Sequence, residues 1–452
     1  MNTKSFFTIL LLIGCSLTGF AAHNLAGEIT YKKVYPNNPA NHEFEITVNT
    51  QHTASSSEDR PYLYILYGDE EQNAALDSIE RIEFFILSEI KYCTYKSFHT
   101  YPGQGEFFIQ MEDPNRSGGI LNMEESISEP FFLESKLSIT GDAVATNENS
   151  VVLLNSTVPS ACIDETWTFN AAAFDVDGDS LVYELVPCKG AGGQEINSWS
   201  LPDQIPGFTY NGDIYLYTDG TIFWEIPLIM GSYSFALKVT EYNSQGVEVG
   251  YVIKDFTVVV ETCSEPPAEF SESIQDISVY PWTEIELELL LEDVIPNLAM
   301  TASGGPLTDM YNTASFEVST EVDQVIGTFN WTPNTGDVRD QPYLVVFNSL
   351  ADGVGGEGTE VVQITVLDPG ENSIRSIESS RINVFPNPTS NSVTLEMEGV
   401  EGQEYNLYNS LGEMLISGSV TQKSQVIDIS SLSANVYFLG IENNVIRLVK
   451  TD

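Results

Sequence analysis

Short segments in which apolar and polar residues alternate recur along most of the chain. Every second residue is apolar in 233–239, and 285–291 alternates in the same way, with one extra apolar residue at Leu290. A period of two is typical of a half-buried β-strand, because successive side chains point to opposite faces of a sheet. Dipeptides that favour tight turns separate such segments: Asp177-Gly178, Asn211-Gly212, Asp219-Gly220 and Asp352-Gly353. The pattern predicts an all-β fold built from β-sandwiches.

The middle of the chain contains an internal repeat. The segment DGTIFW, which ends at Trp224, has a counterpart in IGTFNW, which ends at Trp331. Each copy is followed by an aromatic strand and then by a β-branched strand, and the spacing from the tryptophan to that last strand differs by one residue. The repeat predicts two tandem immunoglobulin-like sandwiches, 150–263 and 264–368, with both tryptophans in their cores.

Other segments flank the repeat. Residues 22–149 contain several alternating stretches and are expected to form an N-terminal β domain. Residues 369–380 are rich in Ser and contain Pro and Gly, which is typical of a linker. Residues 381–452 are expected to form a small C-terminal β-sandwich.

The N-terminal residues 1–21 have the features of a secretory signal peptide. A lysine precedes an apolar run, 6–13, and small residues lead up to a cleavage point after Ala21. The run is too short for a membrane-spanning helix, which needs about 20 apolar residues, and no later apolar segment is long enough. Cys15 also stands where the lipidated cysteine of a bacterial lipoprotein box would be, although the apolar run continues past it, which suits cleavage after Ala21 better.

The charge balance limits the partners of this protein. The 452 residues include 18 Lys and Arg against 65 Asp and Glu, a formal net charge of −47. A nucleic-acid-binding protein needs basic residues to neutralise phosphates, so that class is excluded. A polybasic membrane-surface protein is excluded for the same reason. A surface this acidic attracts cations.

Three alternate carboxylates form the best candidate for a metal site. Asp175, Asp177 and Asp179 would point the same way on an extended segment, and hard oxygen donors suit calcium. The segment is not an EF-hand loop, because Gly178 falls at position four instead of six and Val186 at position twelve. An ordinary Asp-Gly turn with solvated carboxylates is the alternative interpretation. Calcium is the one cofactor that the sequence suggests.

The mature chain would keep four cysteines: Cys93, Cys162, Cys188 and Cys263. An even number in an exported chain indicates two disulfides, for which three pairings exist. Cys162 with Cys188 is the favoured pair, because the two are close in sequence and flank a predicted strand–turn–strand unit. Cys93 and Cys263 would then remain for the second bond. Buried free thiols are the alternative, and the wide spacing argues against a zinc site.

No catalytic motif is present in the sequence. There is no nucleophile elbow, phosphate loop or dinucleotide fingerprint, and the histidines lack the paired spacing of metalloproteases. We therefore expect no catalytic residues and a non-enzymatic protein. The alternative is a secreted hydrolase or a carbohydrate-binding protein with an unrecognised site in 22–149. Converging carboxylates or an exposed aromatic platform in that segment would favour it.

The end of the chain resembles a known family. Five segments in order, 384–389, 405–413, 427–432, 436–441 and 446–450, are similar to the type A C-terminal sorting domain of the type IX secretion system of Bacteroidota. The motif residues are Pro386, Asn387, Pro388, Gly412, Tyr437 and Lys450. The resemblance implies contact with the secretion machinery, passage through the outer membrane, removal of the domain and often attachment to surface lipopolysaccharide. Asn435 replaces the usual glycine, and it tolerates the same left-handed conformation.

The body shows a looser resemblance. Residues 23–31 and 112–116 look like the start of Bacteroidota surface proteins related to gliding-associated ones. Residues 174–183 are similar to a signature of cadherin-like and immunoglobulin-like domains. The resemblance implies the fold and the setting of 22–368. We expect a secreted or cell-surface protein that acts in adhesion or in envelope or matrix contact, with surface glycans or proteins as partners. The resemblance carries over no catalytic residue.

Overall fold

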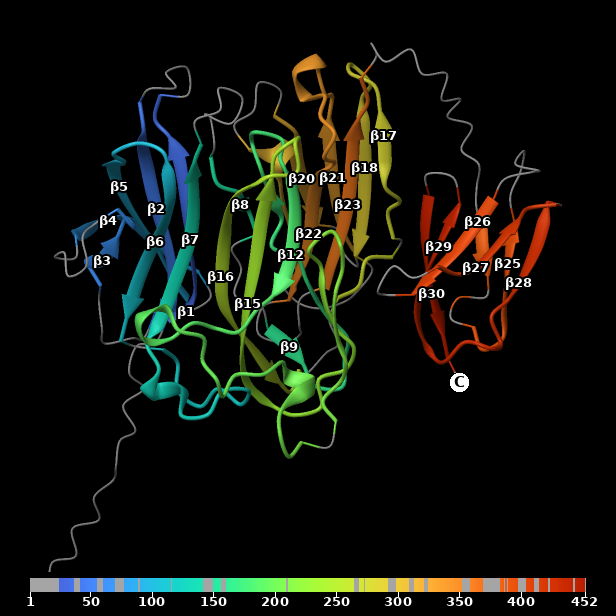
Figure 1. Ribbon diagram of the computed structural model, residues 1–452, viewed down its shortest axis with the longest axis horizontal. Coiled ribbons are helices and arrows are strands. Elements are labelled where there is room, and N and C mark those ends of the chain that lie inside the picture. Colours follow the sequence, from blue (N-terminus) through green and yellow to red (C-terminus); the bar gives the residue numbers. More distant parts are fainter. Residues whose placement is uncertain are drawn as a thin grey trace, which may run out of the picture. The chain divides into compact units, whose positions relative to one another are not determined.

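The computed structural model describes residues 24–451, apart from 36–40, 55–59, 70–76, 88–89, 115, 141–148, 156–159, 209, 264–267, 272, 292–297, 309–312, 321–323, 352–357, 369–382, 386, 388, 397–403, 410–413, 422 and 442–443. The chain divides into two compact units, 1–369 and 370–452. Strands dominate the described residues (Figure 1). The helical segments among the described residues are single 3-10 turns: η1 (Ser126–Ser128), η2 (Ala191–Gly193), η3 (Pro202–Gln204), η4 (Gly305–Leu307) and η5 (Thr335–Asp337). None of the described helices is long or apolar enough to cross a membrane.

The N-terminal domain, which we call the N-terminal sandwich, is a single curled sheet of seven strands: β1 (Asn24–Lys33), β2 (Glu43–Thr53), β3 (Tyr62–Leu66), β4 (Asp77–Leu87), β5 (Ile90–Thr100), β6 (Gly105–Asp113) and β7 (Phe131–Ile139). They lie in the order β1-β2-β5-β4-β3-β6-β7, and all their pairings are antiparallel. The alternation seen in the sequence turns one face of each strand inward. Residues such as Ile46, Ile65 and Ile109 are fully buried in the resulting core.

Strand β16 (Glu248–Glu261) belongs to the second sandwich and also closes the first. Residues 26–27 of β1 and part of β7 both pair with it. Strand β15 (Gly231–Tyr242) pairs with the other edge of β16. The two end strands of the N-terminal sheet, β1 and β7, therefore pair with the same edge of β16. Figure 1 shows β7, β16 and β15 side by side. The predicted segments 22–149 and 150–263 are therefore joined through a continuous sheet.

The second sandwich has an immunoglobulin-like strand arrangement. One layer runs β9 (Ser160–Cys162), β16, β15, β12 (Ser180–Leu185), with β9 parallel to β16. The other layer runs β10 (Trp167–Phe169), β14 (Ile222–Trp224), β13 (Ile214–Leu216). A separate pair is formed by β8 (Val152–Leu153) and β11 (Ala173–Phe174). Two packed sheets of four and three strands with these neighbours match the immunoglobulin class.

The third sandwich repeats that arrangement. One layer runs β17 (Ile277–Val279), β23 (Gly358–Val366), β22 (Tyr343–Ala351), β19 (Leu298–Gly304), with β17 parallel to β23. The other runs β18 (Ile285–Leu291), β21 (Val325–Trp331), β20 (Ser315–Thr320). Trp224 and Trp331 end the equivalent strands β14 and β21, and each ring lies 5.0 Å from a buried tyrosine ring. The predicted tandem immunoglobulin-like sandwiches are confirmed.

The C-terminal unit is a small β-sandwich. Its layers are β24-β25-β28 and β27-β26-β29-β30. The strands are β24 (Asn383–Phe385), β25 (Ser392–Glu396), β26 (Glu404–Asn409), β27 (Met414–Ser419), β28 (Ser424–Asp428), β29 (Asn435–Ile441) and β30 (Asn444–Lys450). Residues such as Val393, Leu407 and Leu439 fill its core. The all-β prediction holds in this unit too.

Candidate functional site

The predicted calcium ligands lie between β11 and β12. Asp175 is almost completely buried, and its Oδ1 accepts hydrogen bonds from the backbone N–H groups of Gly178 and Asp179 at 2.5 and 2.7 Å. The carboxylate of Asp177 accepts a bond from the Asn149 backbone N–H at 2.7 Å. The segment therefore forms an Asp-Gly turn whose carboxylates bind backbone groups.

The pKa values of two carboxyl groups at this turn are raised. Burial raises the pKa of Asp175. Burial, and then the neighbouring carboxylates of Asp175 and Asp179, raise the pKa of Asp177 to about 6. Within the part of the chain that the structure describes, no three His, Cys, Asp or Glu side chains gather closely enough to hold a metal ion. Calcium at this turn stays a prediction.

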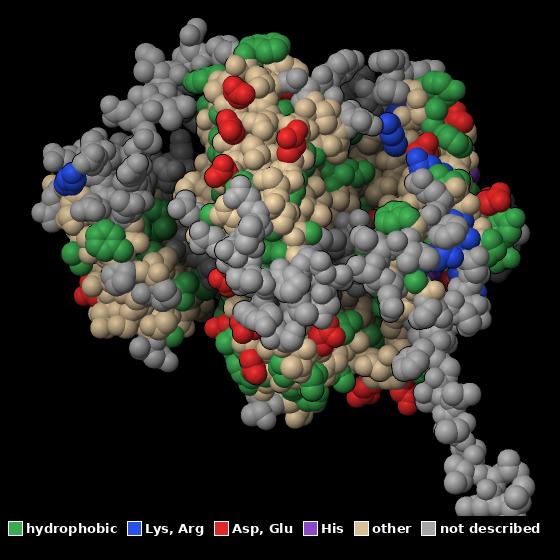
Figure 2. Space-filling view, turned by 180° about the vertical axis from the view of Figure 1, so that it is seen from behind, with side chains coloured by type: hydrophobic (Ala, Val, Ile, Leu, Met, Phe, Trp, Pro, Cys, Tyr) green, Lys and Arg blue, Asp and Glu red, His purple; other side chains and the backbone are tan. Residues whose placement is uncertain are grey.

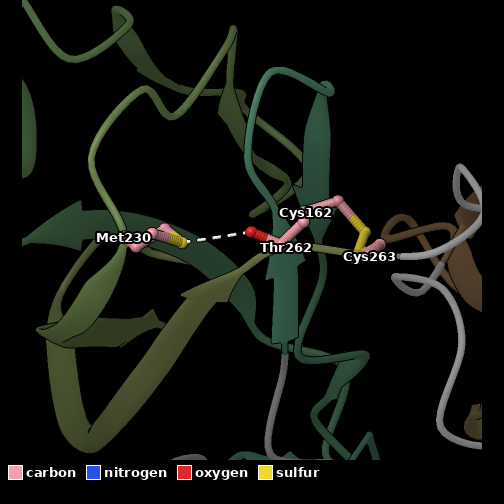
Figure 3. Close-up of a disulfide and its surroundings, with 4 residues drawn as sticks. All are labelled: Cys162, Met230, Thr262 and Cys263. Atoms are coloured by element: carbon pink, nitrogen blue, oxygen red, sulfur yellow. Dashed lines mark hydrogen bonds between the residues drawn. A yellow bond between two sulfur atoms is a disulfide. The ribbon is translucent and has the colours of Figure 1, made fainter.

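The cysteine pairing predicted from the sequence is wrong. Cys162 is bonded to Cys263, with their Cα atoms 5.4 Å apart, while Cys93 and Cys188 are buried free thiols. Parallel pairing of β9 with the end of β16 places Cys162 opposite Glu261, two residues before Cys263. Figure 3 shows this disulfide beside Thr262, whose hydroxyl donates to the Met230 sulfur. Closeness in sequence had favoured Cys188 as the partner of Cys162. In the structure the Cys188 thiol instead lies beside the buried Arg116–Asp255 pair, and burial raises the pKa of this thiol.

The sorting-motif residues lie in the C-terminal unit as far as they are described. Asn387 Oδ1 accepts a hydrogen bond from the Val449 backbone N–H at 2.8 Å, which ties the start of the unit to β30. The buried Tyr437 donates from its hydroxyl to the Ser433 carbonyl at 2.8 Å. Lys450 ends β30 and is largely buried. Three motif residues lie outside the described residues: Pro386, Pro388 and Gly412. The signal peptide and Cys15 lie outside them as well.

The sequence did not single out a group of exposed aromatic side chains on the N-terminal sandwich. On β3, Leu63 and Ile65 are buried in the core, so Tyr62 and Tyr64 point outward, with 52% and 57% of their surface exposed. On β5, Cys93 and Tyr95 point inward, which turns Tyr92 and Phe98 outward. Phe98 is 61% exposed.

Two more rings extend this surface across the neighbouring strands. Phe85 of β4 pairs with Tyr92, and their rings stack with centroids 4.8 Å apart and an interplanar angle of 6°. Phe108 of β6 is exposed at the margin. We call the set the aromatic face: Tyr62, Tyr64, Phe85, Tyr92, Phe98 and Phe108. Because β4 separates β5 from β3 and neighbouring strands are about 4.8 Å apart, rings on the two outer strands stand roughly 10 Å apart.

Polar groups lie between the rings. Lys96 of β5 forms an ion pair with Glu45 of β2 at 2.8 Å. Ile82, at a register shift in β4, is an exposed aliphatic side chain nearby. Figure 2, viewed from behind, shows several Lys and Arg side chains beside exposed hydrophobic ones on the sandwich that holds β1–β7, at the right. The aromatic face thus combines large rings with paired charges.

The second sandwich limits the aromatic face on one side. The segment around η2 lies over β6 and β7, where the Gly192 backbone N–H donates to Glu112 at 2.8 Å and Lys189 forms an ion pair with Glu134. A side chain at Gly193 would collide with the Phe132 ring, which shows how closely this segment lies against the sheet. The outer side of β3, β4 and β5 lies beyond this cover.

Comparisons with known proteins concern mainly the C-terminal unit. Residues 383–451 match the family model of the secretion system C-terminal sorting domain. The match agrees with the resemblance found in the sequence, and the chain is therefore exported through type IX secretion to the outer surface or the medium. No curated protein matches the chain significantly.

Solved structures give distant likenesses only. The D1–D4 ectodomain fragment of ICAM-5 aligns at 12% identity over 90% of this chain and 95% of that chain, with a TM-score of 0.18. The mouse nectin-like molecule 4 ectodomain, Ig1–Ig3, aligns at 10% over 65% and 96%, with a TM-score of 0.16. The endo-fucoidan hydrolase MfFcnA4, of glycoside hydrolase family 107, aligns at 14% over 71% and 38%, with a TM-score of 0.17. Scores this low carry no argument, so the immunoglobulin-like class rests on strand order.

Proposed function

We propose that this protein is a non-enzymatic contact protein of the outer cell surface or the medium, acting in adhesion or in envelope or matrix contact through its aromatic face. The observation that carries the proposal is the set of aromatic rings held outward on β3, β4, β5 and β6. Export through the sorting domain delivers this face to the exterior. Large exposed rings beside one another are typical of surfaces that bind a partner.

A second function is favoured by the same observation. An aromatic platform in 22–149 is what a carbohydrate-binding protein would need, since the apolar faces of sugar rings stack on aromatic side chains. The rings on β3 and β5 stand about two strand spacings apart, roughly 10 Å, which suits a sugar chain longer than one unit. The Lys96–Glu45 pair lies beside Phe98, on β5 and β2, and can bond to hydroxyls. The hydrolase alternative gains no such support.

The remaining parts of the proposal concern setting and partners. The secretion machinery binds the sorting domain during export. Lipopolysaccharide attachment after removal of that domain, and kinship of the body with gliding-associated surface proteins of Bacteroidota, are consistent with a contact protein at the envelope. Other surface glycans or proteins are the partners that the aromatic face would meet there.

The test compares binding of the 22–368 protein with and without the rings. Tyr62→Ala with Phe98→Ala removes one exposed ring from each outer strand. An aromatic contact contributes about 0.5–1.5 kcal/mol, so we expect a loss of roughly fivefold to a hundredfold for the pair. Binding is measured on a polysaccharide panel and on fixed cells of the producing strain.

The matched control changes an equally exposed tyrosine of the third sandwich. Tyr280 is 48% exposed, and Tyr280→Ala should leave binding unchanged. Loss on polysaccharides would favour the carbohydrate-binding function, and loss on cells alone would favour protein-mediated contact. Equal binding of the ring variant and the parent protein on every surface would contradict the proposal.

A further inference from the structure

A lysine, a glutamate and an asparagine form a continuous chain of contacts where the first two sandwiches join. Lys254 lies on β16, Glu28 on β1 and Asn49 on β2. The Lys254 Nζ donates to Glu28 Oε2 at 2.9 Å, and the Asn49 Nδ2 donates to Glu28 Oε1 at 3.1 Å. The pairing of β1 with β16 on one side and with β2 on the other places the three side chains in one cross-strand row. One carboxyl group thus bridges an amine and a carboxamide.

The lysine and the glutamate of this row are withdrawn from water. The Lys254 side chain is fully buried and that of Glu28 is 4% exposed. Taking an ammonium and a carboxylate out of water is costly, and a proton that passes from Lys254 to Glu28 along their hydrogen bond during a reaction would remove both charges. The neutral amine that results is a nucleophile, as in other desolvated lysines. The protonated glutamate becomes an acid placed beside the asparagine amide.

The asparagine is oriented as an electrophile. The Thr94 hydroxyl donates to Asn49 Oδ1 at 3.0 Å, so the carbonyl oxygen faces a hydrogen-bond donor while the amide nitrogen faces Glu28. A donor on the carbonyl oxygen stabilises the negative charge that develops there when a nucleophile adds. An acid on the amide nitrogen protonates the leaving group. Glu28 on β1 therefore links the lysine of β16 to the asparagine of β2, whose carbonyl is polarised by Thr94.

We propose that Lys254 and Asn49 form an intramolecular amide cross-link, with Glu28 as the proton carrier. The neutral Lys254 Nζ adds to Asn49 Cγ, the protonated Glu28 gives its proton to the departing Nδ2, the Cγ–Nδ2 bond breaks, and Glu28 takes a proton from Nζ in return. The products are one secondary amide and one molecule of ammonia. No oxidant, reductant or cofactor takes part, and Glu28 is regenerated.

The cross-link would join β16 to β2 across β1. The N-terminal sandwich, which carries the aromatic face, would then be tied covalently to the second sandwich. Such a bond resists pulling forces and does not depend on the redox state of the surroundings, unlike the Cys162–Cys263 disulfide. A covalent tie at this junction suits a protein that makes contacts outside the cell, although the inference stands on the geometry of the three residues alone.

A similar trio elsewhere provides an internal comparison. Lys189 and Gln110 both donate to the Glu134 carboxylate. The Lys189 side chain is 21% exposed, against none for Lys254, and the Tyr251 hydroxyl also donates to Glu134 at 2.6 Å. Lys189 thus keeps contact with water, and the tyrosine hydroxyl is a further donor to the glutamate. We therefore expect no reaction there.

The decisive measurement is the intact mass of the folded chain 22–452, purified, reduced and then denatured. The expected mass is lower than that of the sequence by one ammonia, and peptide mapping should find a branched peptide joining Lys254 to Asn49. An unchanged mass would overturn the proposal. A loss of one water, which indicates a bond between Lys254 and Glu28, or a branch at Lys189 would also overturn it.

Two variants test the roles of the residues. Glu28→Gln keeps the side chain's shape but removes the proton carrier, so the mass should return to that of the sequence. Lys189→Met is the matched control and should still lose one ammonia. If Glu28→Gln fails to fold, Thr94→Val provides a second test. It removes the hydroxyl that donates to Asn49 Oδ1, so the reaction should be slower. The fraction of cross-linked chains at early times after refolding should therefore be lower than in the parent protein. Complete cross-linking in both variants at all times would contradict the assigned roles.

Discussion

At the scale of single residues, burial decides which charged groups matter. His52 of β2 is almost fully buried, and its ring nitrogen lies 3.0 Å from the Thr50 hydroxyl. The pKa of His52 is lowered from 6.5 to about 4, mainly by burial; Asp113 opposes this shift, and the cationic Lys91, Arg60 and Arg81 add to it. The folded protein therefore holds this histidine neutral.

Acid should destabilise the protein through His52. Because its folded-state pKa lies below its unfolded value, its contribution is complete above pH 6.5 and is lost as the pH falls toward about 4. The full shift corresponds to at most about 3 kcal/mol of unfolding free energy. His52→Gln should flatten the dependence of urea midpoints on pH in this window. The half-buried His42 is the control, and if His42→Gln had the same effect, the assignment to His52 would be wrong.

The aspartate turn gives a second residue-scale prediction. Calcium held at 100 times its dissociation constant would add about 2.7 kcal/mol to the folded state. At roughly 2–4 °C per kcal/mol for a large unit, the melting temperature of the 22–368 protein should rise by about 5–10 °C over chelator. Sodium at matched ionic strength controls for screening of the acidic surface. A calcium response that survives Asp177→Asn with Asp179→Asn, or that sodium reproduces, would show that the turn holds no ion.

At the scale of elements, β16 connects most of the body. It pairs with β15 along one edge and with β7, β1 and β9 along the other. The internal repeat in the sequence predicted a β-branched strand over its second half, but the repeat did not show that this strand lies between two domains and buries charged side chains. Arg116 and Asp255 form a buried ion pair at 2.7 Å beside it. An unpaired buried charge is strongly destabilising. The pair therefore favours the packing of the two domains that brings Arg116 and Asp255 together.

The disulfide fixes the end of β16 to β9. It closes a loop with a sequence separation of 101 residues, for which chain entropy suggests a stabilisation of up to about 4.7 kcal/mol. Cys263→Ser should therefore lower the unfolding free energy by about 2–5 kcal/mol, and reductant should bring the parent protein to the same value. Denaturant midpoints measure both. A peptide that joins Cys162 to Cys188 in a non-reducing digest would disprove this pairing.

At the scale of the whole molecule, the chain separates delivery from contact. The C-terminal unit carries the sorting-domain match, and the unit 1–369 carries the aromatic face. Each has its own hydrophobic core. Removing the first should therefore change where the protein goes without unfolding the second.

Deletion of 381–452 tests this division directly. The truncated protein should accumulate in the periplasm, because the deletion removes the matched sorting domain that directs passage through the outer membrane. Immunoblots of periplasm, cell surface and medium report the distribution, and an unchanged melting temperature of the body confirms its folding. Normal amounts at the surface or in the medium would contradict the role of the sorting domain.

The sequence by itself determined the features that depend on local pattern. Alternation gave the strands, the two tryptophan-centred copies gave the tandem sandwiches, and the ordered motifs of the C-terminal unit gave the route of export. These depend on side chains a few residues apart or on matching copies of one unit, which a single chain displays directly.

Only the tertiary structure decided the features that depend on pairing between distant strands. The partner of Cys162, the closure of the N-terminal sheet on β16 and the row of Lys254, Glu28 and Asn49 all join residues far apart in the chain. Alternation shows that Tyr62 and Tyr64 share a face, but either face of a strand can be the covered one until its neighbours are known. The physical reason is that register and burial belong to the assembled sheet and not to the single strand.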